Sequence, residues 1–433
     1  MIKLEEVKAV YFIGIGGIGM SAVARYFNGQ GLPVSGYDKT KTPLTEALEA
    51  EGMTIHYGDA RTDLMPDHAN DLLVVWTPAI PRNFPELVKA QTEGYHLLKR
   101  AAVLGLLSQS LDCVAVAGTH GKTTTTTITT YLMSQAGLNP HAFLGGIPVD
   151  FPGNYVAGQS NLVVVEADEY DRSFLHLHPQ YAIVLSTDPD HLDIYGDHDN
   201  MLETGFRAFA RQVKPGGVLV VRWDVVGHFE ELVPCPSKLY TFGIGKGDYC
   251  ARNIHVKDGA FHFDLEAPDG DVLKDLRTAL PGRHNVENAV AACAVTLLAG
   301  GSEAGIRRGL ATFGGIRRRF ETKLKTEELV IIDDYAHHPT ELTAAIGAAK
   351  ELYPGRKLTG VFQPHLFSRT QDFAPGFAEA LDKLDDAILI PIYPAREEPI
   401  PGVTSRMIFD QMKNPNRRLL SDEQMLVVTK ELN

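Results

Sequence analysis

The sequence predicts an α/β protein of three domains, because three short apolar strands each run into a turn loaded with polar or charged side chains. The 433-residue chain has such strands at residues 9–15, 113–117 and 329–333. Helix-like segments follow the turns and lead to further strands. Open α/β sheets bind ligands at the carboxyl ends of their strands, so each of these turns is a candidate ligand site.

Composition narrows the class of protein. With 44% apolar and 22% charged residues, the chain can form between two and four well-packed domains. Its net charge of −13 argues against a protein that binds nucleic acid or an anionic membrane. The four cysteines form no C-x-x-C pair, and no run approaches eighteen apolar residues. These features predict a cytoplasmic enzyme without a disulfide framework or a membrane span.

The first block, residues 1–108, begins with a dinucleotide-type fingerprint. A strand at 9–15 leads into Gly14-x-Gly16-x-x-Gly19 and a helix at 20–30, and Asp38 ends the next strand, 34–37. This pattern places a diphosphate at a helix N-terminus and a carboxylate on a ribose, which suits either a nicotinamide cofactor or a UDP-sugar. The candidate UDP-sugar residues, which include the end of a further strand at 72–77, are Gly16, Gly17, Ile18, Gly19, Asp38 and Thr77.

The second block, residues 109–320, contains a phosphate loop. Gly118 to Thr123 follow a strand at 113–117 and open a helix that runs to about Met133. Backbone N–H groups and Lys122 would surround phosphate oxygens, and Thr123 would place its hydroxyl on Mg²⁺. The loop is a shorter variant of G-x-x-x-x-G-K-T, since Val116 occupies the first glycine position. The candidate loop residues are Gly118, Thr119, His120, Gly121, Lys122, Thr123 and Thr124.

Acidic residues follow two other strands of this block. Glu166 ends the strand 161–166 and Asp168 and Glu169 follow it, while Asp188 to Asp193 follow the strand 181–187. Carboxylates beside a phosphate loop are where a nucleotide-bound metal needs ligands, so Thr123, Glu166 and His191 are the metal candidates. Imidazole is not a typical Mg²⁺ ligand, and His191 alternatively bonds a metal-bound water. Two further stretches are expected to be a strand at 217–222 and antiparallel β structure at 240–265.

A hinge is expected at residues 313–320, which contain two glycines and three arginines. The third block, 321–433, alternates strands at 329–333, 357–362 and 387–392 with helix-like segments, which predicts another parallel sheet. His337 and His338 follow the strand 329–333, and His365 and Arg369 follow the strand 357–362. Together these two strand ends form a candidate pocket for a small anion such as an amino acid carboxylate.

Seven motifs together resemble the Mur ligase family. They occur in this order over nearly the whole chain: Gly14-Ile15-Gly16-Gly17-Ile18-Gly19-Met20-Ser21, Gly118-Thr119-His120-Gly121-Lys122-Thr123-Thr124-Thr125, Glu166-Ala167-Asp168-Glu169, Asp190-His191-Leu192-Asp193, His284-Asn285-x-x-Asn288-Ala289, Arg318-Arg319-Phe320 and Asp333-Asp334-Tyr335-x-His337-His338-Pro339. The phosphate loop and the last motif are the most specific. One departure is Leu366, at a place where many alanine-adding relatives have an arginine.

The resemblance implies a Rossmann-like N-terminal domain, a central P-loop ATPase α/β domain with additional antiparallel strands, and a Rossmann-like C-terminal domain. It implies an ATP- and Mg²⁺-dependent ligase that joins L-alanine to the lactyl carboxylate of UDP-N-acetylmuramate through an acyl phosphate. The roles it implies are adenine binding by Asn285 and Asn288, ribose binding by Asp334, amino acid binding by Tyr335, His337 and Arg369, and catalysis by Lys122, Glu166, His191 and Arg319.

Other functions stay open on the sequence alone. A sister ligase adds a recycled L-Ala-γ-D-Glu-meso-diaminopimelate tripeptide to the same UDP-sugar and has a similar ATP loop. A nicotinamide-dependent oxidoreductase explains the first block but leaves the second nucleotide site without a use. A P-loop switch or motor explains ATP use without a small-molecule product.

Overall fold

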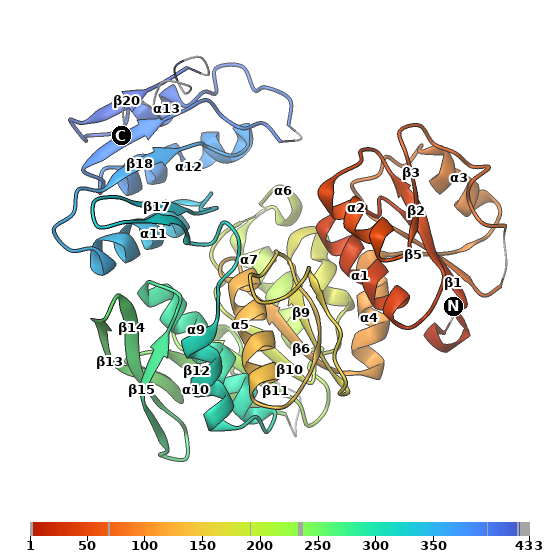
Figure 1. The fold of residues 1–433 in the computed structure, drawn as a ribbon, viewed down its shortest axis with the longest axis horizontal. Coiled ribbons are helices and arrows are strands. Elements are labelled where there is room, and N and C mark those ends of the chain that lie inside the picture. Colours follow the sequence, from red (N-terminus) through yellow and green to blue (C-terminus); the bar gives the residue numbers. More distant parts are fainter. Residues whose placement is uncertain are drawn as a thin grey trace. The chain divides into compact units, whose positions relative to one another are not determined.

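The computed structural model describes residues 3–67, 70–190, 192–232, 237–395, 397–421 and 424, and these form an α/β protein (Figure 1). The chain divides into two compact units. The first comprises Met1–Asn253, Phe263–Arg277 and Glu287–Arg317, and the second comprises Ile254–His262, Thr278–Val286 and Arg318–Asn433.

The first sheet contains five parallel strands in the order β3-β2-β1-β4-β5. The apolar runs of β1 and β4 are almost completely buried, as expected for central strands of a parallel sheet. Helix α1 begins at Ile18, two residues before the predicted start, because Gly17 adopts the extended conformation of an N-cap. The elements are β1 (Ala9–Ile13), α1 (Ile18–Gly29), β2 (Val34–Asp38), α2 (Pro43–Ala50), β3 (Thr54–Tyr57), β4 (Leu72–Trp76), α3 (Pro85–Thr92), β5 (His96–Lys99) and α4 (Arg100–Ser110).

The second sheet contains ten strands in the order β15-β14-β13-β12-β11-β10-β6-β9-β7-β8. Strands β6, β9, β10 and β11 are parallel, and the predicted strand, turn and helix around the phosphate loop are β6, residues 118–121 and α5. The strands are β6 (Asp112–Ala117), β7 (His141–Phe143), β8 (Tyr155–Val156), β9 (Leu162–Ala167), β10 (Tyr181–Val184), β11 (Val218–Arg222), β12 (Lys238–Ile244), β13 (Tyr249–Lys257), β14 (Ala260–Glu266) and β15 (Val272–Thr278). The helices are α5 (Lys122–Gln135), α6 (Leu192–Tyr195), α7 (His198–Met201), α8 (Ala208–Ala210), α9 (Arg283–Leu298) and α10 (Glu303–Thr312).

The prediction of antiparallel pairing throughout residues 240–265 is wrong for the first pair of strands, β12 and β13. Residues 242–244 of β12 pair with residues 249–251 of β13 in parallel. Gly245 and Gly247, with φ of +73° and +109°, let the chain loop back over this short distance.

Helix α1 joins the first sheet to β7 and β8 of the second. The buried Asn154 side chain donates to Ser21 Oγ at 3.0 Å and to the carbonyl of Ile18, and it accepts from Arg25 Nη1 at 2.5 Å. Tyr26 packs its ring at 5.8 to 6.1 Å from the rings of three central residues, His141, Phe143 and Tyr155. The joint therefore combines buried polar contacts with aromatic packing.

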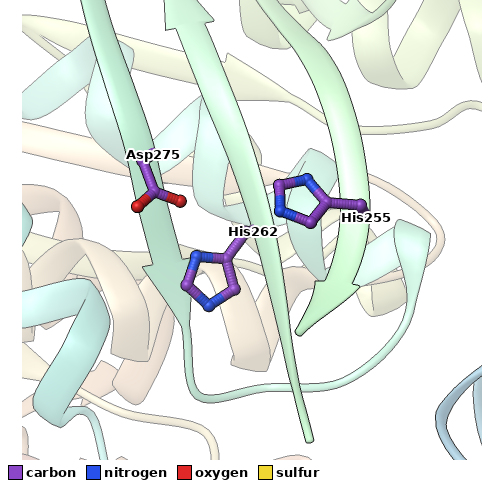
Figure 2. Close-up of side chains that lie close together, drawn as sticks. All are labelled: His255, His262 and Asp275. Atoms are coloured by element: carbon purple, nitrogen blue, oxygen red, sulfur yellow. The ribbon is translucent and has the colours of Figure 1, made fainter. Parts of the chain in front are cut away.

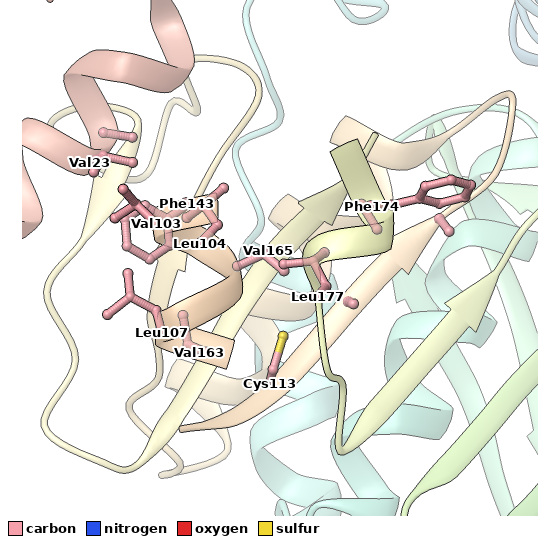
Figure 3. Close-up of a cluster of buried hydrophobic side chains, with 14 of the residues drawn as sticks. Val23, Val103, Leu104, Leu107, Cys113, Phe143, Val163, Val165, Phe174 and Leu177 are labelled. Atoms are coloured by element: carbon pink, nitrogen blue, oxygen red, sulfur yellow. The ribbon is translucent and has the colours of Figure 1, made fainter. Parts of the chain in front are cut away.

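A hydrophobic cluster continues across this joint. Val23 from α1 and Val103, Leu104 and Leu107 from α4 belong to one cluster with residues of β6, β7 and β9 (Figure 3). Because one core serves both sheets, we expect the two sheets of the first unit to unfold together.

The second unit contains a two-stranded antiparallel sheet, β16-β17, and a three-stranded parallel sheet, β18-β19-β20. The predicted parallel sheet is thus correct for β18 and β19 but wrong for β17, because β16, which was not predicted as a strand, pairs with it. The elements are β16 (Glu321–Lys325), β17 (Val330–Asp333), α11 (Pro339–Leu352), β18 (Thr359–Phe362), α12 (Phe367–Leu381), β19 (Asp386–Leu389), α13 (Arg406–Phe409) and β20 (Arg417–Leu419).

At the tip of the β13–β14 hairpin, the rings of His255 and His262 stack with centroids 5.5 Å apart (Figure 2).

Candidate phosphate and substrate sites

The phosphate loop has the backbone geometry that its glycines predict. Gly118 and Gly121 have φ of +140° and +81°, and Gly121 is the N-cap of α5. A Cβ on Gly118 would lie 2.9 Å from Leu185 Cβ, and one on Gly121 would lie 2.8 Å from Asn288 Oδ1. Both positions therefore require glycine, and Asn288, predicted to meet adenine, lies beside the loop.

Lys122 is the cation of the loop and forms a buried ion pair with Glu169. Its Nζ lies 2.8 and 2.7 Å from the two carboxylate oxygens and donates to the Gly118 carbonyl at 2.8 Å. Burial alone would lower the pKa of Lys122, but the carboxylates of Glu169, Asp168 and Glu166 outweigh it and raise that pKa. The lysine is therefore charged and held in place at neutral pH.

Glu166 and Thr123 bring oxygen ligands together at the start of α5. The Thr123 hydroxyl donates to the Glu166 carboxylate, with Oγ1 at 3.1 and 3.0 Å from its two oxygens. Hydroxyl and carboxylate oxygens are ligands that Mg²⁺ prefers. His191, the third predicted metal residue, lies outside the described residues.

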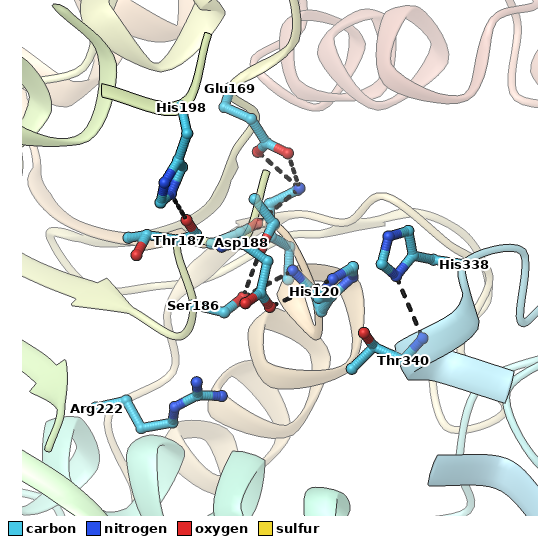
Figure 4. Close-up of polar contacts among 12 residues, drawn as sticks. His120, Glu169, Ser186, Thr187, Asp188, His198, Arg222, His338 and Thr340 are labelled. Atoms are coloured by element: carbon cyan, nitrogen blue, oxygen red, sulfur yellow. Dashed lines mark hydrogen bonds and ion pairs between the residues drawn. The ribbon is translucent and has the colours of Figure 1, made fainter. Parts of the chain in front are cut away.

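Ser186, which the sequence analysis missed, links the loop to the strand end after β10. Its Oγ accepts from the His120 backbone N–H at 3.0 Å and lies 2.9 Å from Thr119 Oγ1, while Asp188 lies 3.5 Å from His120 Nε2 (Figure 4). The rule that drew attention to Asp188 also covers Ser186, because both follow the same strand.

The fingerprint loop lies on a cavity that also contains the acidic strand end. This cavity, of about 340 Å³, is lined by Gly17, Ile18, Gly19 and Thr77 and also by Glu166 and Asp168. Asp38 turns toward the loop itself and accepts the Gly16 N–H at 2.7 Å. Its predicted contact with a ribose stays a prediction.

Several predicted nucleotide residues belong to the second unit. The side-chain amide of Asn285 donates to the Pro281 carbonyl at 2.6 Å. Asp334 accepts the N–H groups of Phe320 and Ala336, each at 2.7 Å. Arg319 lies 5.8 Å above the Tyr335 ring. Their contacts with ATP stay predictions.

Two of the three predicted amino acid residues, Tyr335 and His337, belong to a cluster of aromatic rings in the second unit. The Tyr335 ring lies 5.1 Å from that of His337 and 6.0 Å from that of His365, which stacks on Tyr393 at 5.7 Å. Burial lowers the pKa of His337; Glu341 opposes this shift and the charge of Arg369 adds to it. The arrangement favours a neutral imidazole near a guanidinium, which suits a carboxylate ligand.

Replacing Arg369 by alanine is expected to raise the KM for the amino acid roughly 10- to 100-fold, the cost of losing a charge-assisted hydrogen bond. The KM for ATP should change little. Initial rates at varied amino acid concentration measure this. Arg406→Ala is the control, because Arg406 is an exposed arginine of the same unit that lies 3.7 Å from Asp410. An unchanged KM for the amino acid would show that Arg369 does not bind it.

Family models match three consecutive parts of the chain. The "Mur ligase family, catalytic domain" model matches residues 9–110, the "Mur ligase middle domain" model 116–296, and the "Mur ligase, glutamate ligase domain" model 318–430. Among the helices that the structure describes, none combines the length and apolar character needed to cross a bilayer.

Relatives are similar over the full length. A UDP-N-acetylmuramate–L-alanine ligase of Flavobacterium johnsoniae is 45% identical over 99% of this chain and 93% of its own. The solved UDP-N-acetylmuramate–alanine ligase of Thermotoga maritima has a TM-score of 0.78 at 29% identity, covering 96% of this chain and 91% of its own. A murein peptide ligase of Psychrobacter arcticus has a TM-score of 0.67 at 24% identity, covering 98% and 92%, which shows likeness of fold alone.

Proposed function

This chain belongs to the Mur ligase family, and we propose that it joins L-alanine to the lactyl carboxylate of UDP-N-acetylmuramate in an ATP-dependent reaction. Full-length relatives at about 45% identity carry this activity in their names. The structural observation that carries the proposal is a cavity lined both by the fingerprint loop and by Glu166. A UDP-sugar bound at the loop would extend its sugar toward the ATP site.

We propose one role for each of the three parts of the chain. We assign residues 1–108 to the UDP-sugar, 109–320 to ATP and the chemistry, and 321–433 to closure over ATP and binding of the amino acid. The oxygen donors of Thr123 and Glu166 fit Mg²⁺, which would neutralise charge on the β- and γ-phosphates when bound. His191 is the remaining candidate for the metal or its water.

Phosphorylation makes the substrate carboxylate reactive. The negative charge of a carboxylate repels an amine nucleophile, and a carboxylate oxygen is a poor leaving group. In the first step a carboxylate oxygen attacks the γ-phosphorus, the bond from that phosphorus to the bridging oxygen breaks, and ADP leaves. Lys122 stabilises the charge on the equatorial oxygens of the transferring group, and Arg319 is assigned the same role.

The second step forms the amide. The neutral amine of L-alanine attacks the acyl carbon of the acyl phosphate, and inorganic phosphate leaves with the electrons of the broken C–O bond. A base takes the proton lost by the amine. Excluding water protects the acyl phosphate from hydrolysis, which is the purpose we assign to closure of residues 321–433.

The test is phosphate release from ATP and Mg²⁺ in the presence of UDP-N-acetylmuramate. Reactions receive L-alanine, the L-Ala-γ-D-Glu-meso-diaminopimelate tripeptide, or no acceptor. We expect release to require both the UDP-sugar and L-alanine. Dependence on the tripeptide would instead identify the sister ligase, and release indifferent to every acceptor would leave only an ATPase.

A further inference from the structure

Arg100 is a cation on the wall of the cavity that neither the motifs nor the family comparisons singled out. It is the first residue of α4, it is half-buried, and it lines the cavity together with Gly19, Glu166 and Asp168. Although two carboxylates share this wall, the described part of the chain offers Arg100 no salt bridge at 4.0 Å or less. A guanidinium held in a cavity without such a partner is suited to an anionic ligand.

The guanidinium lies directly over the fingerprint loop. A Cβ built on Gly19 would come within 2.5 Å of Arg100 Nη1 and 3.1 Å of Arg100 Cδ. Gly19 is in the first turn of α1, whose N-cap, Gly17, has no side chain to satisfy the first N–H groups. Loop and guanidinium thus present hydrogen-bond donors to the same space.

The loop supplies no positive side chain of its own. Residues 14–21 contain no lysine or arginine. A helix N-terminus contributes only about half a unit of positive charge, whereas a diphosphate carries about two negative charges. Because the protein as a whole has a net charge of −13, a bound diphosphate needs a local cation.

We propose that Arg100 binds the diphosphate of the UDP-sugar, together with the N-terminus of α1. This inference rests on the proposed function. A guanidinium fits two phosphate oxygens with parallel hydrogen bonds. The same guanidinium paired with the lactyl carboxylate would reduce the nucleophilicity of the reacting oxygen, whereas on the diphosphate it leaves that oxygen free. Gly19 then has a second purpose, since any Cβ there would displace Arg100.

The experiment compares Arg100→Ala and Arg100→Lys with the unaltered enzyme in calorimetric titrations with UDP and with UDP-N-acetylmuramate at one fixed salt concentration. Arg100→Ala should weaken both ligands by a similar factor, roughly 10- to 100-fold, as for the loss of charge-assisted hydrogen bonds. Arg100→Lys should lose less, because it keeps the charge but not the planar fork. Gly19→Ala should resemble Arg100→Ala, and ATP affinity should stay unchanged.

Lys8→Ala is the matched control, because it removes one positive charge from an exposed position near the start of β1. Thermal unfolding of each variant checks that it folds. Unchanged affinity for UDP and UDP-N-acetylmuramate in Arg100→Ala would overturn the proposal, and so would a loss confined to UDP-N-acetylmuramate, which would place the guanidinium on the carboxylate. These titrations involve no turnover, so failure of the ligase assignment shows separately, in the phosphate-release assay.

Discussion

Replacing Lys122 by methionine is expected to reduce ligation by roughly 100- to 1,000-fold, the usual cost of removing one group that stabilises transition-state charge. Lys122 is the loop's side-chain cation, and Glu169 holds its Nζ at 2.7 Å. The change leaves Glu169, only 1% exposed, without its cation. Removing one partner of such a pair costs about 3–5 kcal/mol of stability, so loss of activity alone would be ambiguous.

The double variant Lys122→Met with Glu169→Gln separates the two effects. Burial raises the pKa of the Glu169 carboxyl and Lys122 opposes that shift, so a neutral amide in place of the carboxyl relieves the uncompensated charge. Thermal unfolding should return toward that of the unaltered enzyme, while ligation stays low. Recovery of ligation together with stability would show that Lys122 is structural and does not contact phosphate.

Replacing Glu166 by glutamine is expected to raise the Mg²⁺ concentration needed for half-maximal rate. The expected factor is at least roughly 10- to 100-fold, the range seen even for residues that only support metal ligands. Glutamine keeps the size of the side chain and can still accept from Thr123, so stability should change little. Rates at varied Mg²⁺ and saturating ATP measure the effect. An unchanged Mg²⁺ requirement would remove Glu166 from the metal site.

Gly145→Ala gives an independent variant for the same site. A Cβ on Gly145 would lie 2.1 Å from Glu166 Oε2, so the flexible carboxylate must move while the fold remains. Gly145→Ala is expected to raise the Mg²⁺ concentration needed for half-maximal rate, as Glu166→Gln does, but by a smaller factor. Gly29→Ala is the control, because a Cβ there meets nothing within 4 Å.

Local pattern predicted the elements around both glycine-rich loops. The alternation of apolar strand, glycine turn and helix identified β1 with α1 and β6 with α5, because each signal lies within about 20 residues. Pairing between strands was less predictable. Whether β17 pairs with β16 or with a parallel neighbour depends on contacts that periodicity does not encode.

The residues that the sequence did not indicate are mostly those whose contacts span long sequence separations. Arg100 meets Gly19 from 81 residues away, and its own surroundings, the start of an ordinary helix, carry no motif. Asn154 lies in a loop without a local pattern, yet it contacts Ser21 and Arg25. Only Ser186 had a usable signal, since it lies at the end of the predicted strand 181–187, next to acidic residues.

The joint on α1 limits how this enzyme can be re-engineered. The first turn of the helix lines the cavity that reaches Glu166, while Ser21 and Arg25 contact Asn154 and Tyr26 packs on β7 and β8 of the second sheet. A chimera that takes its N-terminal domain from another ligase would therefore lose the contacts between α1 and the second sheet, unless residues 141–158 come from the same donor. The unit that can be exchanged between ligases therefore includes β7 and β8 of the second sheet and does not end with the first sheet.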